Sequence, residues 1–232
     1  MAIAVTPLLS AISTNNATAY SYTVATAPTS GTLLLLGIGT HGAGGLTTLV
    51  PFTVSGLATT WVLIADVIVD NRLICFRGMP SAPTSGTLTV GGMLSNSSSM
   101  IVGLLQFDGV STLSTDGADA IVQVASTNAT SSALAVSLAP FGSTSNMSVG
   151  LFNGRTTRHL IAGAGFIVQT TAQTGLETNS FLTETAIDTT AVIATVDVST
   201  AWLGVAVEVK ASTIAVAAGV FGANRRMLGM GR

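Results

Sequence analysis

Apolar and polar residues alternate with a period of two along most of this chain. Tyr20, Tyr22 and Val24, for example, share one face of an extended segment whose other face carries Ser21 and Thr23. This alternation is typical of a half-buried β-strand, and no stretch shows the 3.6-residue period of an amphipathic helix. The sequence therefore predicts an all-β protein.

Two kinds of strand are expected. Residues 133–138, 147–151 and 203–210 alternate, and each should have one face that is wet or lightly packed. Residues 61–69 and 100–107 are apolar on both faces, which predicts central positions in a sheet or strands covered by another chain. Further strands are expected near residues 32–39, 86–92, 120–125, 164–170, 180–187 and 191–198.

Turn signals connect these strands. Asp70 and Asn71 separate two apolar runs and predict a tight hairpin turn. The heptapeptide Ala-Pro-Thr-Ser-Gly-Thr-Leu occurs at residues 27–33 and 82–88, each time before an expected strand. Its Pro and Gly suit a turn, so it is either a turn used twice or a true internal repeat. About a dozen short strands without helical crossovers predict an antiparallel β-sandwich of jelly-roll type.

The sandwich is expected to span residues 18–210, between an N-terminal arm at residues 1–17 and a C-terminal extension at residues 211–232. The end of that extension is basic, because three of the eight Lys and Arg residues fall in its last eight positions. We expect it to be an arm that holds a neighbouring subunit. The candidate assembly contacts are Phe221, Arg225, Arg226, Met227, Leu228 and Arg232.

Charge is scarce in this chain. Charged residues make up 8%, about a third of the ordinary share, while mean hydropathy is +0.65. High hydropathy excludes a disordered chain, and 8 Lys and Arg against 10 Asp and Glu give no basic field for nucleic acid. Soluble β-proteins use Lys and Glu to keep their sheet edges from associating. The deficit therefore predicts a homo-oligomer or a larger assembly.

Membrane and disulfide classes are not favoured. The most hydrophobic run, residues 33–38, is far shorter than the roughly 20 residues of a spanning helix. Residues 1–7 contain no Lys or Arg, so they do not resemble a secretory signal peptide. The single cysteine, Cys75, excludes an intrachain disulfide framework and is expected in the core.

The histidines and carboxylates suggest no catalytic group. His41, in a Gly-rich segment expected to be a flexible connection, and His159 lack the spacing of zinc ligands and are expected in loops or interfaces. Asp116 and Asp119 could give a Ca²⁺ ion two oxygens, fewer than a calcium loop supplies.

Glu184 and Asp188 would lie about 13 Å apart on one strand, too far for a glycosidase pair. They are therefore expected to be surface acids. No group of carboxylates or histidines remains that could cleave a polysaccharide on this fold. The sequence predicts no enzyme, no metal and no cofactor.

Five segments together resemble the jelly-roll virion proteins of tailed bacteriophages: residues 27–34, 56–61, 85–90, 101–110 and 201–207. The resemblance covers about residues 18–210 and rests on fold-like motifs, so it supplies no functional residues. It implies a structural protein of the virion. Such proteins are often trimers that cement or decorate a capsid, or modules of tails and fibres.

The expected function is therefore that of a non-enzymatic virion protein, foremost a capsid cement or decoration subunit. Its expected partners are further copies of itself, with a trimer favoured, and the major capsid protein or other virion proteins. Neither a membrane nor direct recognition of nucleic acid is expected. The alternative is a tail or fibre module that binds host glycans. Sugars would then stack on exposed aromatic rings, and the large amphipathic rings are Trp61, Trp202, Tyr20 and Tyr22.

Overall fold

The structure, a computed structural model, describes residues 2–15, 17–42, 51–92, 97–174 and 179–213. These residues form β-strands joined by turns, with one short 3-10 helix. The elements are β1 (Ala4–Ser13), β2 (Ala19–Val24), β3 (Leu33–Gly42), β4 (Thr53–Gly56), β5 (Val62–Ile68), β6 (Asn71–Gly78), β7 (Gly86–Gly91), β8 (Ser97–Asp108), η1 (Ala118–Ala120), β9 (Ile121–Ser137), β10 (Met147–Gly154), β11 (Ile161–Ala162), β12 (Ile167–Thr174), β13 (Asn179–Ile187) and β14 (Ala191–Val209). The all-β prediction is confirmed.

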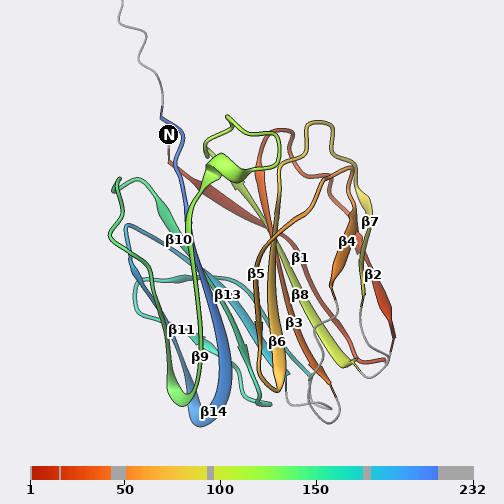
Figure 1. Cartoon of the computed structure of the whole chain (residues 1–232), viewed down its shortest axis with the longest axis vertical. Helices are drawn as coiled ribbons and strands as arrows, with labels where there is room; N and C mark the ends of the chain where they lie inside the picture. Colours follow the sequence, from red (N-terminus) through yellow and green to blue (C-terminus); the bar gives the residue numbers. More distant parts are fainter. Residues whose placement is uncertain (1, 16, 43–50, 93–96, 175–178, 214–232) are drawn as a thin grey trace, which may run out of the picture.

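Three antiparallel sheets are stacked face to face as layers (Figure 1). The central sheet has the strand order β1-β8-β3-β6-β5. A small sheet, β2-β7-β4, covers one of its faces, and a large sheet covers the other. The large sheet has the order β11-β14-β10-β13-β12, and β9 pairs with β14 outside this path. The expected antiparallel sandwich is thus present, with an additional layer.

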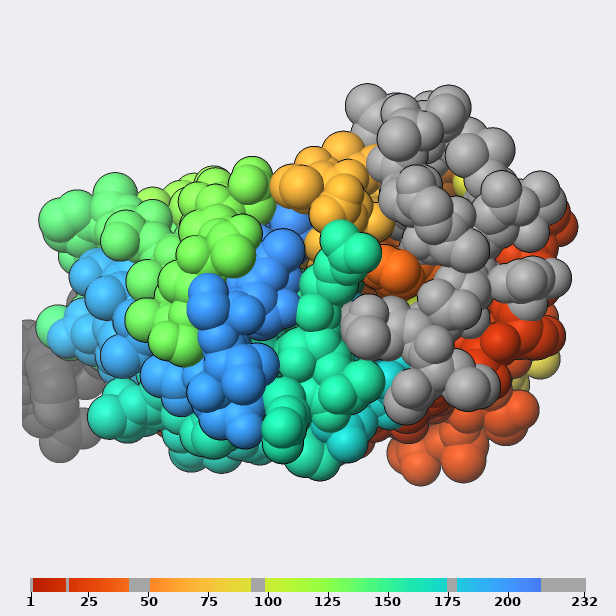
Figure 2. Space-filling view, turned by 90° about the horizontal axis from the view of Figure 1, so that it is seen from below, coloured from red at the N-terminus to blue at the C-terminus, as the bar shows by residue number. Residues whose placement is uncertain are grey.

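The layers follow the sequence. Residues 4–108 supply the central and small sheets, and residues 121–209 supply the large sheet. Figure 2 shows this division, because green and blue residues occupy one half of the molecule and red to orange residues the other. Residues 4–13, within the segment expected to be an N-terminal arm, form β1 and pair with β8 at the edge of the central sheet.

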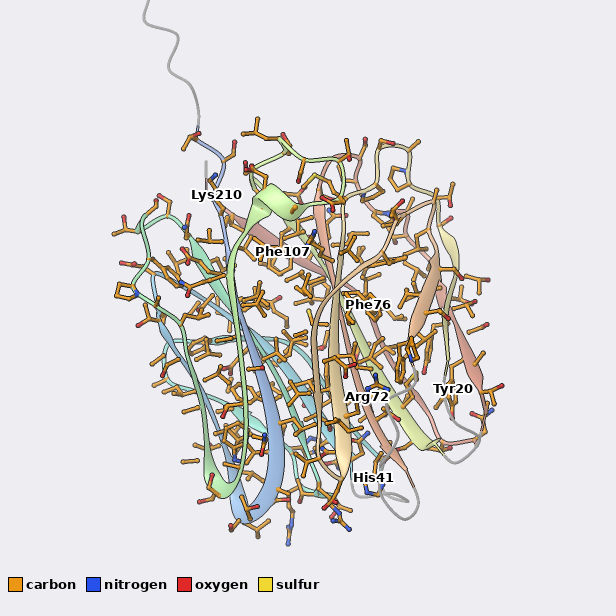
Figure 3. All side chains as sticks on the ribbon, viewed as in Figure 1. Tyr20, His41, Arg72, Phe76, Phe107 and Lys210 are labelled. Atoms are coloured by element: carbon orange, nitrogen blue, oxygen red, sulfur yellow. The ribbon has the colours of Figure 1, made fainter. Side chains whose placement is uncertain are left out.

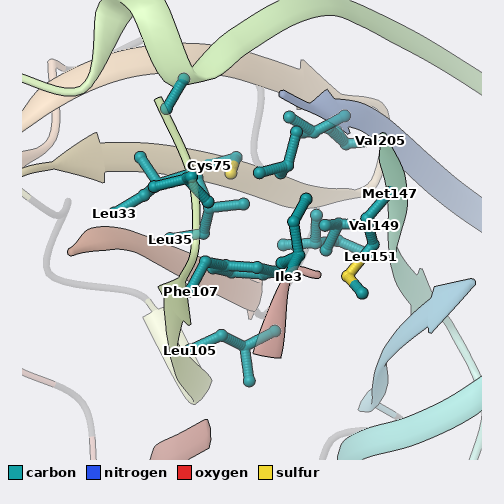
Figure 4. Packing of buried hydrophobic residues seen from close by; sticks show 14 of the residues in the cluster. Ile3, Leu33, Leu35, Cys75, Leu105, Phe107, Met147, Val149, Leu151 and Val205 are labelled. Carbon is teal, nitrogen blue, oxygen red and sulfur yellow. The ribbon is translucent and has the colours of Figure 1, made fainter. Parts of the chain in front are cut away.

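The main core lies between the central and large sheets. Phe107, Leu105 and Leu35 from the central sheet meet Val149 and Leu151 from the large one (Figure 4). The two sheets approach closely at glycines of β3. A Cβ on Gly37 would lie 2.4 Å from Leu151 Cδ2, so a larger residue there would force the layers apart. The Gly-rich segment expected to be a flexible connection is, up to Gly42, a central strand.

A second core lies between the central and small sheets. Tyr20, Tyr22 and Val24 point into it while their neighbours on β2 are exposed, as the alternation predicts. The Asp70–Asn71 hairpin is also confirmed, because Val69 N–H donates to the Asn71 carbonyl at 2.9 Å between β5 and β6. Cys75 is fully buried in the main core, as expected.

The outer face of the large sheet is covered as well. β9 and β14 pair along most of their length, but their register shifts between Thr195 and Thr200. The ends of these strands, residues 133–137 and 191–196, pack over the outer face of the sheet, and we call them the covering ribbon. Their apolar side chains form a third core with the large sheet, including Leu134, Val136, Val192, Ala194, Val196, Phe152, Leu182 and Ala206.

The covering ribbon overturns one sequence prediction. Residues 147–151 and 203–210 were expected to have one wet or lightly packed face. Instead, both faces are buried in residues 147–151 and 203–209, and Lys210 is partly exposed. The outer residues of β10 and β14 are small, such as Gly150, Gly204 and Ala206, and small residues let the covering ribbon approach. Only the prediction for residues 133–138 is confirmed, with Leu134, Val136 and Leu138 buried.

The strands expected to be apolar on both faces have different positions. β8 is an interior strand of the central sheet, and residues 100–107 are buried on both faces as predicted. β5 is an edge strand, and its Leu63 is 47% exposed, so a central position for residues 61–69 is wrong. Within the part of the chain that the structure describes, no helix could span a membrane.

Candidate functional site

The six residues expected to make assembly contacts, Phe221, Arg225, Arg226, Met227, Leu228 and Arg232, lie outside the described residues. The acids and histidines that the sequence singled out lie on the described body of the molecule.

Asp116 and Asp119 form ion pairs with basic side chains of the same chain. Asp116 pairs with Arg77 at 3.0 Å and Asp119 with Lys210 at 3.6 Å, on either side of the loop that precedes β9. The backbone N–H of Ala118 and the Arg77 guanidinium lower the pKa of Asp116. The Ser111 hydroxyl, followed by Lys210, lowers that of Asp119. The two carboxylates therefore fasten this loop to β6 and to the end of β14.

His41 is buried rather than exposed in a loop. It is the last residue but one of β3 and is 7% exposed, close to Arg72 at the lower end of the molecule (Figure 3). Arg72 is buried too, makes two hydrogen bonds to the Asp66 carboxylate at 2.7 and 2.5 Å, and stacks over the Phe52 ring at 4.5 Å. His159 is exposed in the loop before β11, as expected.

Asparagines join the central and large sheets beside this pair. Asn71 donates its amide to the Asn153 carbonyl at 3.3 Å, and Asn153 donates to the Arg72 carbonyl at 3.1 Å. Both amides are buried. The sequence pattern assigned Asn71 only to a hairpin turn and did not single out Asn153. They hold the two sheets in register at this end, where the apolar core gives way to polar groups.

Glu184 is a buried acid, so its expected place on the surface is wrong. It lies on the outer face of β13 beneath the covering ribbon, and burial raises its pKa to about 8. Asp188 follows the end of β13 and is exposed, as expected. Glu208 is also buried, and accepts hydrogen bonds from Gln123 and Asn146, both at 2.6 Å. Within the described ranges, no three His, Cys, Asp or Glu side chains gather as metal ligands would.

The large aromatic rings do not provide a surface for stacking sugars. Tyr20, Tyr22 and Trp202 are at most 7% exposed, and the Trp202 indole donates to Ser131 Oγ at 3.0 Å. Trp61 is half-buried against the second core. None of these four rings is exposed as a platform of the kind on which sugars usually stack.

One surface hollow is lined by five polar or charged residues and one isoleucine. It has a volume of about 350 Å³ and is lined by Thr157, Arg158, His159, Ile161, Gln173 and Asp197. We call it the polar pocket. Arg158 and Asp197 form an exposed ion pair at 3.6 Å across it, so it offers both a cation and hydrogen-bonding groups to a small ligand.

A second hollow is lined mainly by apolar residues. It has a volume of about 650 Å³ and lies where the start of β1 meets β12 and the end of β13. We call it the apolar groove, and it is lined by Ile3, Val5, Met147, Gly165, Ile167, Gln169, Thr185, Ala186 and Ile187. Ile167 is 68% exposed and Ile187 is 56% exposed, and Val168 beside them is 47% exposed. Clustered exposed isoleucines of this kind are typical of an interaction surface.

Comparison of the chain with protein-family models, with curated proteins and with solved structures finds no match.

Proposed function

We propose that this protein is a non-enzymatic structural protein of a phage virion, with a jelly-roll type of sandwich. Its foremost role in this proposal is that of a capsid cement or decoration subunit, which stabilises the head through contacts between subunits. The apolar groove carries this proposal. Exposed isoleucines edge this groove. Covering them with another chain stabilises the complex by about 25 cal/mol for each Å² of apolar surface buried.

The described surface offers little electrostatic steering toward a charged partner. All five described Lys and Arg side chains are paired with aspartates: Arg72, Arg77, Arg155, Arg158 and Lys210. An assembly built on such a surface depends on apolar contact and neutral hydrogen bonds. Ionic strength should have little effect on this apolar and neutral part of the contact, because salt screens only charges.

The first experiment is the copy number of this polypeptide in purified native particles, by quantitative mass spectrometry against the major shell protein. A number comparable with that of the shell protein supports a cement or decoration subunit. A few copies per particle would place the protein in a tail, neck or fibre instead. Absence from the particles would overturn the proposal.

The polar pocket favours a second candidate, a tail or fibre module that binds host glycans. Arg158, His159 and Gln173 present donors and acceptors that suit sugar hydroxyls and carboxylates. The test is a glycan array with the intact protein and with Gln173→Ala. Binding that Gln173→Ala abolishes supports this candidate, and no bound glycan refutes it.

A further inference from the structure

Three of the eight basic residues of this chain lie outside the described body. The sequence has eight Lys and Arg residues, and the five described ones are all in ion pairs with aspartates. The other three are Arg225, Arg226 and Arg232, at the end of the segment 214–232. The rest of this segment is mostly small and apolar, and it contains Phe221, Met227 and Leu228.

Exposed acids also remain without ion pairs. Within the described residues, Asp188 makes no ion pair and is exposed, directly after the groove residue Ile187. Asp108 is partly exposed, makes no ion pair there either, and pairs in register with Ala4 at the start of β1. Asp188, a carboxylate without an ion pair among the described residues, thus lies at the end of a groove whose lining is uncharged and mainly apolar.

The described chain ends beside this groove. Ala211 donates its N–H to Asn146 Oδ1 at 3.1 Å, and Asp188 donates its N–H to the Asn146 carbonyl at 3.0 Å. The next residue, Met147, lines the groove. Figure 3 shows Lys210, shortly before this exit, at the opposite end of the molecule from His41 and Arg72.

We propose that the apolar groove binds segment 214–232 of a neighbouring copy of this chain, with Asp188 accepting hydrogen bonds from the arginine pair of that segment. The proposal rests on the proposed function and names the surface on which the subunits meet. Apolar side chains around Phe221 fill the groove between the exposed isoleucines. Arg225 and Arg226 then neutralise the carboxylate at its end, a charge-assisted contact that fixes the direction of the segment.

The spacing favours a neighbour over the same chain. Arg225 lies twelve residues beyond Thr213, which is about 40 Å for an extended segment at roughly 3.3 Å per residue. A body of this size is itself about 40 Å across. Because Asp188 lies next to the exit, an extended segment carries its arginines away from the Asp188 of its own chain and across to another copy.

The test uses full-length single-cysteine probes. One copy carries Ile167→Cys and a second copy carries Phe221→Cys, and the mixture is treated with a short bismaleimide. The native Cys75 should not react, because it is fully buried and its pKa is raised to about 12. Ile161→Cys, at a site 57% exposed on β11 outside the groove, replaces Ile167→Cys as the matched control.

We expect a cross-linked pair of chains with Ile167→Cys and none with Ile161→Cys. A cross-link that forms only within one chain, in the double variant Ile167→Cys, Phe221→Cys, would overturn the assignment to a neighbour. No cross-link in either arrangement would overturn the segment as the occupant. As a second measurement, Asp188→Asn should weaken self-association about tenfold. Asn tolerates the positive φ of 51° at this position, so the backbone should be unaffected.

The outcomes also separate this inference from the proposed function. Particles that contain the protein at high copy number, without the groove cross-link, would contradict the inference and keep the function. A specific cross-link in a protein that is absent from particles would support the inference and contradict the proposed function.

Discussion

The backbone N–H of Gly163 donates to Oε2 of Glu184 at 3.3 Å, while Oε1 of the same carboxyl has no hydrogen-bond partner among the described residues. The carboxyl is shut beneath the covering ribbon, and its pKa is raised to about 8 by burial, with the Gly163 contact opposing the shift. Glu184 is therefore protonated in the folded protein at neutral pH and ionised in the unfolded chain.

This difference predicts that the free energy of unfolding falls as the pH rises from about 4.5 to about 8. The folded pKa is above the ordinary value of 4.5, so the contribution of Glu184 is complete below pH 4.5 and is lost as pH rises through about 8. Between these values the free energy of unfolding should fall by up to about 1.4 kcal/mol per pH unit. Urea unfolding of Glu184→Gln should show a flatter pH profile than the wild type. An unchanged profile would contradict the assignment, and Asp197→Asn, at an exposed ion pair, is the control.

Gly150→Ala should loosen the covering ribbon. A Cβ at Gly150 would lie 2.5 Å from Val192 Cγ1 and 2.9 Å from Glu184 Cγ, so packed side chains must move. We expect a loss of about 1–3 kcal/mol in the free energy of unfolding, measured in urea. Gly142→Ala is the matched control, because nothing lies within 4 Å of the Cβ that it adds. Equal stability of the two variants would contradict the close approach of the ribbon.

Asp66→Asn should destabilise the fold by about 2 kcal/mol or more, because it leaves the buried Arg72 guanidinium without its carboxylate. Asp70→Asn removes the partner of Arg155 in an ion pair whose side chains are 48% and 52% exposed. That variant should change stability by less than about 1 kcal/mol. Thermal unfolding of both variants checks the contrast, and similar shifts would refute it.

Cys75 should resist thiol reagents in the native protein at pH 8. It is fully buried, and burial raises its pKa to about 12, so almost none of it is thiolate. Labelling followed by mass spectrometry should show modification only after addition of denaturant. Rapid labelling of the folded protein would show that the main core opens readily.

Deletion of residues 215–232 should leave the sandwich folded and weaken assembly. The three described cores are built from residues 3–211, all of which the deletion leaves in place, so circular dichroism and the thermal midpoint should change little. Light scattering should show a smaller assembly, and binding to particles should decrease. Unchanged particle binding by the shortened protein would contradict a role for this segment as an arm.

The sequence by itself determined the class of fold and much of its local geometry. Alternation placed Tyr20 and Val24 inward on β2, and the Asp70–Asn71 turn joins β5 to β6 as expected, because both depend only on residues near in sequence. Cys75 could also be assigned to the core from its residue type.

Tertiary structure alone decided which polar and small residues are buried. Gly150 and Glu184 are residue types expected on a solvent-exposed face of a strand. They are buried because a shift in register after Thr195 places the covering ribbon over them. His41 is buried for a similar reason, since β3 continues through a Gly-rich segment to the end of the sheet. The apolar groove joins β1 to β12 and β13, strands more than 150 residues apart in sequence. Periodicity describes the two faces of a strand, but what covers each face depends on contacts between distant parts of the chain.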